Sequence, residues 1–162
     1  MKKVGIITFH AANNFGAVLQ CYALQQTIKK LGFDVEIIDY RPKAITTGYK
    51  AMIRHPISLI KAKGINQALK RIFNFVLMAR ICLRNYRFYI FKKNNLNTSK
   101  NVFYTKKSLR TDPPQYDIYI VGSDQVWNPY ITHGLDSSFF LDFAPKEKVK
   151  IGYGVSIGQT KD

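Results

Sequence analysis

The pattern of a βαβ unit occupies the first 42 residues and constrains the fold more than any other feature of this sequence. Residues 4–9 (VGIITF) form a continuous apolar run that is typical of a buried parallel strand. A segment with apolar residues at helical spacing follows, and Gly32 stands where the end of a helix favours glycine. A second apolar run at residues 35–38 completes the unit. Because such a crossover is right-handed almost without exception, the pattern predicts an α/β sheet with parallel strands.

Further strand patterns appear in the last third of the chain. Residues 118–121 (IYIV) predict a third buried strand, and residues 149–155 (VKIGYGV) predict a fourth that its glycines weaken. Residues 139–143 (FFLDF) add a short apolar piece between them. We therefore expect an open, mostly parallel, Rossmann-like sheet with helices on both faces. Because the sequence stops directly after a strand, we expect either an edge strand there or the first part of a longer protein.

Charge divides the chain into three segments. The formal net charge is +15, and its excess lies in residues 43–110, which hold 16 lysines and arginines and no acidic residue. The rest of the chain carries nine basic and ten acidic residues. This shift predicts a βαβ unit at 1–42, a basic helical insertion at 43–111 and a βαβ continuation at 112–162, within a single α/β domain.

The basic segment carries the pattern of a helix over residues 65–90. Its apolar residues recur in alternating steps of four and three: Ile65, Leu69, Ile72, Val76, Ala79, Leu83, Tyr86 and Ile90. Four further apolar residues widen this stripe: Phe73, Leu77, Ile81 and Phe88. One interpretation is a helix that docks on the core through this stripe and leaves a solvated basic face. The other is a basic face that meets anionic lipid head groups. Nucleic acid is disfavoured as a partner, because no helix-turn-helix, zinc-finger or RNA-binding signature accompanies the charge.

Composition places the chain among soluble globular proteins. It has 162 residues, of which 46% are hydrophobic and 22% are charged, and no apolar run approaches the length of a membrane span. The apolar stretch after the basic start is too short for a signal peptide. The two cysteines, Cys21 and Cys82, form neither a disulfide framework nor a zinc motif, which favours a reducing compartment. We interpret the chain as a cytoplasmic protein, peripheral at the inner face of the membrane if its basic segment binds lipid.

Polar residues cluster in the loops that follow the predicted strands. In open α/β sheets ligands bind beyond the carboxyl ends of the strands, and residues 10–16, 122–128 and 156–158 should meet at that edge. One carboxylate, several amides and hydroxyls and one aromatic ring form a set suited to binding sugar hydroxyls. The candidates are His10, Asn13, Asn14, Ser123, Asp124, Gln125, Trp127, Asn128 and Ser156.

Each of these residues also has a purely structural interpretation. Asn13 and Asn14 are typical turn formers and helix N-caps, and Ser123 with Asp124 can cap a following turn. Trp127 can be a core residue, and His10 can be a hydrogen-bonded structural histidine.

Several cofactor motifs are excluded by the same loops. Residue Asp39 ends the second predicted strand, where a dinucleotide fold places its ribose carboxylate, but the first loop lacks G-x-G-x-x-G and we discount NAD. The sequence contains no Walker A, H-E-x-x-H or G-x-S-x-G motif, and no cluster of metal ligands is visible. We therefore expect no cofactor and no metal.

These loops resemble those of the polysaccharide pyruvyl transferase family. Residues 13–20 (NNFGAVLQ) with 22–25 (YALQ) and residues 38–42 (IDYRP) are similar to the family's opening. Residues 116–129 (YDIYIVGSDQVWNP) are the most specific match. The resemblance extends over essentially the whole chain, weakly through the basic segment, and it adds Gly16 and Gln20 to the candidate substrate-binding residues.

The resemblance implies two Rossmann-type domains that face a cleft, the GT-B arrangement, of which this chain resembles the first. Family members transfer pyruvate from phosphoenolpyruvate to sugar hydroxyls and form a ketal on a cell-surface polysaccharide. This chemistry needs a general base for the hydroxyl, for which Asp124 or His10 is the candidate, and cations for the donor. By family analogy a second domain supplies those cations, so we expect an acceptor-side half that is inactive by itself.

Two other functions stay open at the level of sequence. The same fold could serve a GT-B glycosyltransferase that uses a nucleotide sugar, although residues 122–128 favour the pyruvyl transferases. A non-catalytic basic module that binds membrane or nucleic acid is the second alternative, but such a module does not need an Asp-Gln-Trp-Asn loop.

Overall fold

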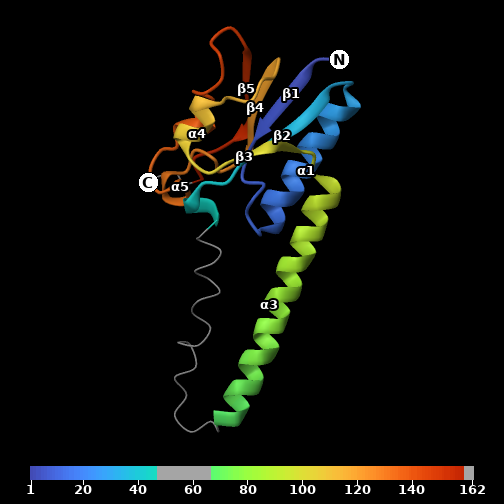
Figure 1. Cartoon of the computed structure of the whole chain (residues 1–162), viewed down its shortest axis with the longest axis vertical. Coiled ribbons are helices and arrows are strands. Elements are labelled where there is room, and N and C mark those ends of the chain that lie inside the picture. Colours follow the sequence, from blue (N-terminus) through green and yellow to red (C-terminus); the bar gives the residue numbers. More distant parts are fainter. Residues whose placement is uncertain (47–66, 159–162) are drawn as a thin grey trace.

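Five parallel strands form one open sheet in the order β3-β2-β1-β4-β5 (Figure 1). The computed structural model describes residues 1–46 and 67–158. The strands are β1 Lys3–Ile7, β2 Asp34–Tyr40, β3 Thr98–Phe103, β4 Ile118–Asp124 and β5 Val149–Val155. The helices are α1 Phe15–Lys30, α3 Gln67–Asn95, α4 Lys106–Thr111 and α5 Pro129–Thr132, with the 3-10 helix η1 at Ser137–Phe140. The predicted Rossmann-like α/β fold is confirmed, and each of the four predicted strands is present.

Strand β1 is the centre of the sheet. Its residue Ile6 pairs with Ile37 of β2 on one side and with Ile120 of β4 on the other. Apolar β-branched residues pack well between two covered faces, which explains why all three positions carry isoleucine. The register brings the carboxyl ends of β1, β2 and β4 to the same edge of the sheet.

A separate hydrophobic cluster covers each face of the sheet. On one face Cys21, Leu24 and Ile28 of α1 pack against alternate residues of the strands, such as Val4 and Ile6. On the other face the strands contribute Ile7, Ile38, Tyr40, Tyr119 and Val121, which pack against Leu109, Phe139, Leu141 and Phe143. The prediction of helices on both faces is confirmed, although short elements rather than a long helix cover the second face.

Strand β3 was not predicted from the sequence. Its residues, TSKNVF, are mostly polar, and only Ser99 and Phe103 are buried. Contacts from other elements hold the strand in place. The Asp39 backbone N–H donates to the Ser99 hydroxyl at 2.9 Å, and the Asn97 side chain donates to the Val35 carbonyl at 2.7 Å. Because these bonds join distant residues, the local pattern carries no signal for the strand.

The last turns of helix α3 contact α1, and the earlier part of the helix extends away from the sheet (Figure 1). At 1.5 Å per residue its 29 residues span roughly 43 Å. The contact with α1 is aromatic: the rings of Phe88 and Phe15 are 4.7 Å apart, and those of Phe91 and Tyr22 are 5.6 Å apart. None of the helices among the described residues combines the length and the apolar character that a membrane crossing requires.

Part of the predicted apolar stripe of α3 is exposed. Phe88, which meets α1, is 5% exposed, whereas Val76, Leu83 and Tyr86 of the predicted stripe are 49%, 50% and 60% exposed. The helix therefore meets the domain through Phe88, which widens the predicted stripe, while these three stripe positions stay exposed. The aromatic side chains of α1 contact the side of the widened stripe that carries Phe88. The earlier stripe residues Ile65, Leu69 and Ile72 lie outside the described side chains.

Substituting Gly5 tests the packing at the centre of the sheet. A Cβ added at Gly5 would overlap ring carbons of Tyr116, whose hydroxyl donates to Glu36 at 2.6 Å. Overpacking of this kind costs about 1–3 kcal/mol, and we expect Gly5→Ala to lower the free energy of unfolding in urea by that amount. Gly152→Ala is the matched control, because its Cβ would make ordinary contacts of 3.5 Å or more. Equal stability of the two variants would contradict this account of the Tyr116 packing.

Candidate functional site

A cavity of about 660 Å³ opens at the carboxyl edge of the sheet, where the loops after β1, β4 and β5 meet. We name it the strand-end cavity. Seven predicted site residues line it: Asn14, Gly16, Gln20, Ser123, Asp124, Gln125 and Ser156. The expectation that the three loops share one edge is thus met by their geometry. Asn14 also has its predicted structural role, since its side chain accepts from the Ala17 N–H and caps α1.

Gln20 ties the first loop to the end of β4. Its side-chain amide donates to the Thr8 hydroxyl at 2.9 Å and to the Ala17 carbonyl at 3.0 Å. Its carbonyl oxygen accepts from the Ser123 N–H at 3.1 Å. The Gln20 side chain thereby forms hydrogen bonds with the end of β1, with α1 and with β4. These bonds hold the ends of β1 and β4 together.

Asp124 supplies the carboxylate of the strand-end cavity. One of its oxygens accepts from the Gln125 N–H at 2.7 Å, and among the described residues it forms no ion pair. Burial raises the pKa of the Asp124 carboxyl above its ordinary value, although the hydrogen bond from Gln125 opposes this rise. The half-buried carboxylate keeps unused acceptor positions, which suits it to accept a hydrogen bond or a proton from a sugar hydroxyl.

Close packing of β5 on β4 brings Ser156 beside Asp124. Gly122 has a φ of +121°, and a Cβ there would overlap the Tyr153 carbonyl. Glycine at this position therefore permits the approach of the two strands. The Ser156 N–H then donates to the Asp124 carbonyl at 3.1 Å, which brings the loop after β5 into the cavity wall.

Trp127 and Asn128 lie behind the strand-end cavity rather than on its wall. The Trp127 indole N–H donates to the Phe139 carbonyl at 2.9 Å, and its ring stacks on Phe140 with centroids 5.3 Å apart. Asn128 caps α5 by accepting from the Tyr130 N–H and donates to the Gln125 side chain. The structure therefore gives both residues positioning contacts. The aromatic side chains on the wall include Phe9 and Tyr130, and His133 joins them there.

His10 and Asn13 line a different cavity, of about 770 Å³, which we name the cationic cavity. Four basic residues contribute to its wall: Arg41, Arg84, Lys92 and Lys93. Ala12 and Ile45 line both cavities, so the two are neighbours with a shared wall. The sequence prediction that His10 and Asp124 reach one edge of the sheet is met, but the two side chains line separate cavities.

His10 belongs to a buried network centred on Asp39. Its Nε2 lies 3.0 Å from Asp39 Oδ1 and its Nδ1 lies 3.3 Å from the Thr8 carbonyl, so both ring nitrogens are engaged. Arg41 donates to the two Asp39 oxygens at 2.6 and 2.7 Å. Burial by itself would raise the pKa of Asp39, but the hydrogen bonds from His10 and Arg41 outweigh it and lower the pKa to about 2.

A family model for polysaccharide pyruvyl transferases matches residues 14–162. The chain belongs to this family. A comparison with curated proteins found no match. The family match begins at Asn14, so it includes Asp124 and Asp39 but not His10, which lies before the matched residues. Among the described residues no group of three histidine, cysteine or acidic side chains could hold a metal ion.

Two basic residues of this pyruvyl transferase domain escaped the sequence prediction of site residues. Arg41 lies in the run 38–42 that resembles the family's opening, and Lys92 lies in the basic segment, but neither is among the predicted site residues. The Lys92 ammonium donates to the Ala11 carbonyl at 3.2 Å and to Asn13 Oδ1 at 2.9 Å, and burial lowers its pKa. The sequence pattern could not place Lys92 at the first loop, because the two are some 80 residues apart in the chain and meet only in the tertiary structure.

We expect the contribution of Asp39 to the free energy of unfolding to be lost at low pH. Its pKa is lowered from 3.8 to about 2 on folding, so the contribution is complete above about pH 4 and is lost as the pH falls towards 2. We expect Asp39→Asn to lower the free energy of unfolding by about 3 kcal/mol at pH 6, because it leaves His10 and Arg41 without their partner. The difference from the native chain should shrink at pH 2.5.

Urea unfolding at both pH values measures this effect. Asp142→Asn is the matched control, since its partner Arg110 is exposed and surface pairs contribute only about 0–1 kcal/mol. A stability difference for Asp39→Asn that stays constant from pH 6 to pH 2.5 would contradict the assignment of the lowered pKa.

Proposed function

We propose that this domain binds the sugar acceptor of an enzyme that transfers pyruvate from phosphoenolpyruvate to a pair of sugar hydroxyls. The family membership supports the reaction class. The observation that carries the acceptor role is the half-buried Asp124, which forms no ion pair among the described residues and lies in a cavity with amides, hydroxyls and His133 on its wall. Such groups bind sugar hydroxyls, whereas a phosphate would require cations.

In the proposed reaction the oxygen of an acceptor hydroxyl attacks the enol carbon of the donor, and Asp124 accepts the proton of that hydroxyl. The donor methylene takes up a proton and becomes the methyl group. The second hydroxyl then forms the other C–O bond of the ketal, its proton leaves, and the C–O bond to phosphate breaks. The products are the pyruvate ketal and inorganic phosphate. A positioned base of this kind contributes about 10²–10⁴-fold to a rate.

The donor has to be held by cations that the strand-end cavity does not offer. Among its described lining residues His133 is the single group that could carry a positive charge. We therefore propose that phosphoenolpyruvate is bound mainly by a second domain, as the family resemblance implies. The neighbouring cationic cavity, with Arg41 and Lys92, adds positive potential on the same side of the sheet.

His10 remains the second candidate for proton transfer. Its side chain is buried and hydrogen-bonded to Asp39, and it lines the cationic cavity. It would reach a substrate only if that substrate extends across the shared wall at Ala12 and Ile45. We assign the base to Asp124 and a positioning role to His10.

The proposed setting is the synthesis of a cell-envelope polysaccharide in the cytoplasm, at the inner face of the membrane. Two free cysteines are compatible with a reducing compartment. A nucleotide-sugar glycosyltransferase would share the fold and differ in the donor. An assay that offers both donors, and follows inorganic phosphate and nucleoside diphosphate separately, distinguishes the two reactions.

The 162-residue chain by itself should release no phosphate from phosphoenolpyruvate in the presence of a polysaccharide acceptor. The reason is that its strand-end cavity lacks a cluster of cations for the donor. The measurement is phosphate release compared with a heat-inactivated sample. Acceptor oligosaccharides should nevertheless bind, which chemical shifts in residues 122–128 would report. Turnover by the chain alone would overturn the division of roles between two domains.

Asp124→Asn should separate catalysis from stability. In an enzyme that joins this domain to the second family domain, we expect turnover to fall by about 10²-fold or more. The melting temperature should stay close to that of the native enzyme, because asparagine preserves the acceptor for the Gln125 N–H. Since burial raises the pKa of Asp124, native activity should decline on the acid side at a pH above 3.8.

Asp112→Asn serves as the control for Asp124→Asn, because this exposed aspartate stands at the C-terminal end of α4 and is not among the residues that line the cavity. Turnover that stays unchanged in Asp124→Asn would remove this residue from catalysis and leave a capping role, which asparagine fills as well as aspartate.

A further inference from the structure

The outward surface of α3 is apolar and has no partner among the described residues. Seven large apolar side chains of this helix are exposed: Phe73, Phe75, Val76, Met78, Leu83, Tyr86 and Tyr89. We name five positions on the side opposite Phe88 the α3 outer face: Phe75, Val76, Ala79, Leu83 and Tyr86. The exposed fraction of Phe75 is 75%. An exposed apolar face of this extent is typical of an interaction surface rather than of free protein surface.

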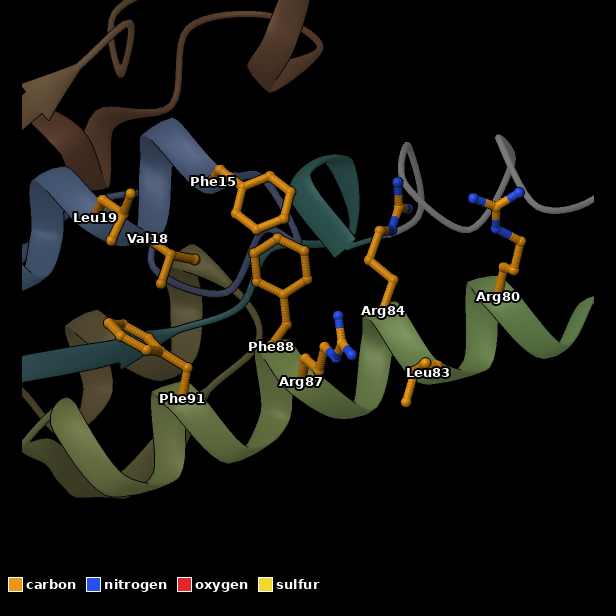
Figure 2. A pocket seen from close by; sticks show the side chains of 9 residues that line it. All are labelled: Phe15, Val18, Leu19, Arg80, Leu83, Arg84, Arg87, Phe88 and Phe91. Atoms are coloured by element: carbon orange, nitrogen blue, oxygen red, sulfur yellow. The ribbon is translucent and has the colours of Figure 1, made fainter. Parts of the chain in front are cut away.

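A groove between α1 and α3 continues this apolar surface (Figure 2). It has a volume of about 440 Å³, and its floor is formed by Phe15, Val18 and Leu19 of α1 with Leu83, Phe88 and Phe91 of α3. Leu83 belongs both to the groove and to the α3 outer face. Figure 2 shows the rings of Phe15 and Phe88 together at the centre of the groove, with Arg84 and Arg80 extending from the next turns of α3.

Positive charge surrounds the apolar surface without compensation. Helix α3 contains seven basic residues and no acidic residue over positions 67–95. Three arginines line the groove: Arg80, Arg84 and Arg87. Among the described side chains none of the α3 cations forms an ion pair with an aspartate or glutamate. A partner for this surface must therefore supply negative charge as well as an apolar phase.

The charge excludes a second copy of the same helix as the partner. Two α3 helices placed together would bring seven cations against seven with no acidic residue between them, and like charges repel. A nucleic acid would satisfy the arginines but would leave Phe75, Leu83 and Val76 in water. An anionic bilayer satisfies both requirements, because its interface joins phosphate groups to hydrocarbon within a few ångströms.

We propose that the α3 outer face and the adjoining groove dock on the surface of an anionic lipid bilayer. Phe75, Leu83 and Val76 enter the boundary between head groups and acyl chains, where the rings of Tyr86 and Tyr89 are also favoured. The stems of Arg80 and Arg87 lie along the apolar surface while their guanidinium groups reach lipid phosphates. This contact is independent of the reaction under Proposed function, and it would hold the strand-end cavity near the membrane.

Co-sedimentation of the 162-residue chain with vesicles tests the proposal. Vesicles of phosphatidylglycerol and phosphatidylcholine should bind the chain about tenfold or more tightly than vesicles of phosphatidylcholine alone, because each bound cation adds attraction. Phe75→Gln combined with Leu83→Gln should weaken binding to the anionic vesicles by about tenfold or more, since apolar insertion is lost. Glutamine keeps a helix propensity close to that of leucine, so helix content by circular dichroism should be preserved.

Two control variants match these changes at other exposed positions. Leu135→Gln with Ile157→Gln removes two exposed apolar side chains outside α3, and should leave binding unchanged. Arg80→Gln with Arg87→Gln should weaken binding more than Lys100→Gln with Lys107→Gln, although both pairs lower the net charge from +15 by two. An equal loss in the two charge variants would mean that net charge alone attracts the chain, and it would overturn the proposed face.

Cys82 offers a direct report of insertion. It is exposed on α3, whereas Cys21 is buried and its pKa is raised to about 12, so a thiol dye should label Cys82 selectively. A polarity-sensitive dye should brighten on anionic vesicles and keep its emission on neutral ones. Unchanged emission, or tight binding to an RNA oligonucleotide combined with no binding to anionic vesicles, would overturn the proposal.

Discussion

Strand β1 pairs in parallel with β2 and β4, and this central position determines where every loop of the site begins. Ile6 lies between Ile37 and Ile120 in the register, so the three strand ends reach one edge together. Gln20 then joins the first of these ends to the last through the Thr8 hydroxyl and the Ser123 N–H. Gly122 allows β5 to approach closely enough for Ser156 to bond the Asp124 carbonyl. The strand-end cavity is a consequence of these few contacts.

Two aspartates, Asp39 and Asp124, lie at the carboxyl edge of the sheet, and their environments differ. Asp39 is buried but fully engaged by His10 and Arg41, which hold its pKa at about 2 and make it a structural anion. Asp124 has one backbone hydrogen bond, and its pKa is raised by burial. The carboxylates of Asp39 and Asp124 therefore differ in their capacity to accept a proton, because a carboxylate that already has strong donors is a poor proton acceptor.

Charge and apolar surface are distributed over different parts of the domain. Among the described residues, the strand-end cavity has amides, hydroxyls and one histidine around a single aspartate, while α3 combines cations with exposed aromatic and aliphatic side chains. Lys92 and Arg84 join the two regions, since both line the cationic cavity between them. This arrangement supports the two proposals, in which one face of the domain binds a neutral sugar and another docks on an anionic surface.

The sequence by itself determined the βαβ unit, the parallel sheet, the helix within the basic segment and the polar loops at the strand ends, because periodicity and loop chemistry are local properties. It did not determine β3, whose polar residues are held by Asp39 and Val35 from a distant strand. Nor did it determine which part of the broad apolar stripe of α3 meets the domain, since that depends on the contact between the rings of Phe15 and Phe88. The division of His10 and Asp124 between two cavities also depends on tertiary structure. It depends on the wall at Ala12 and Ile45 and on the Asp39 network, which form only when segments far apart in the chain pack together.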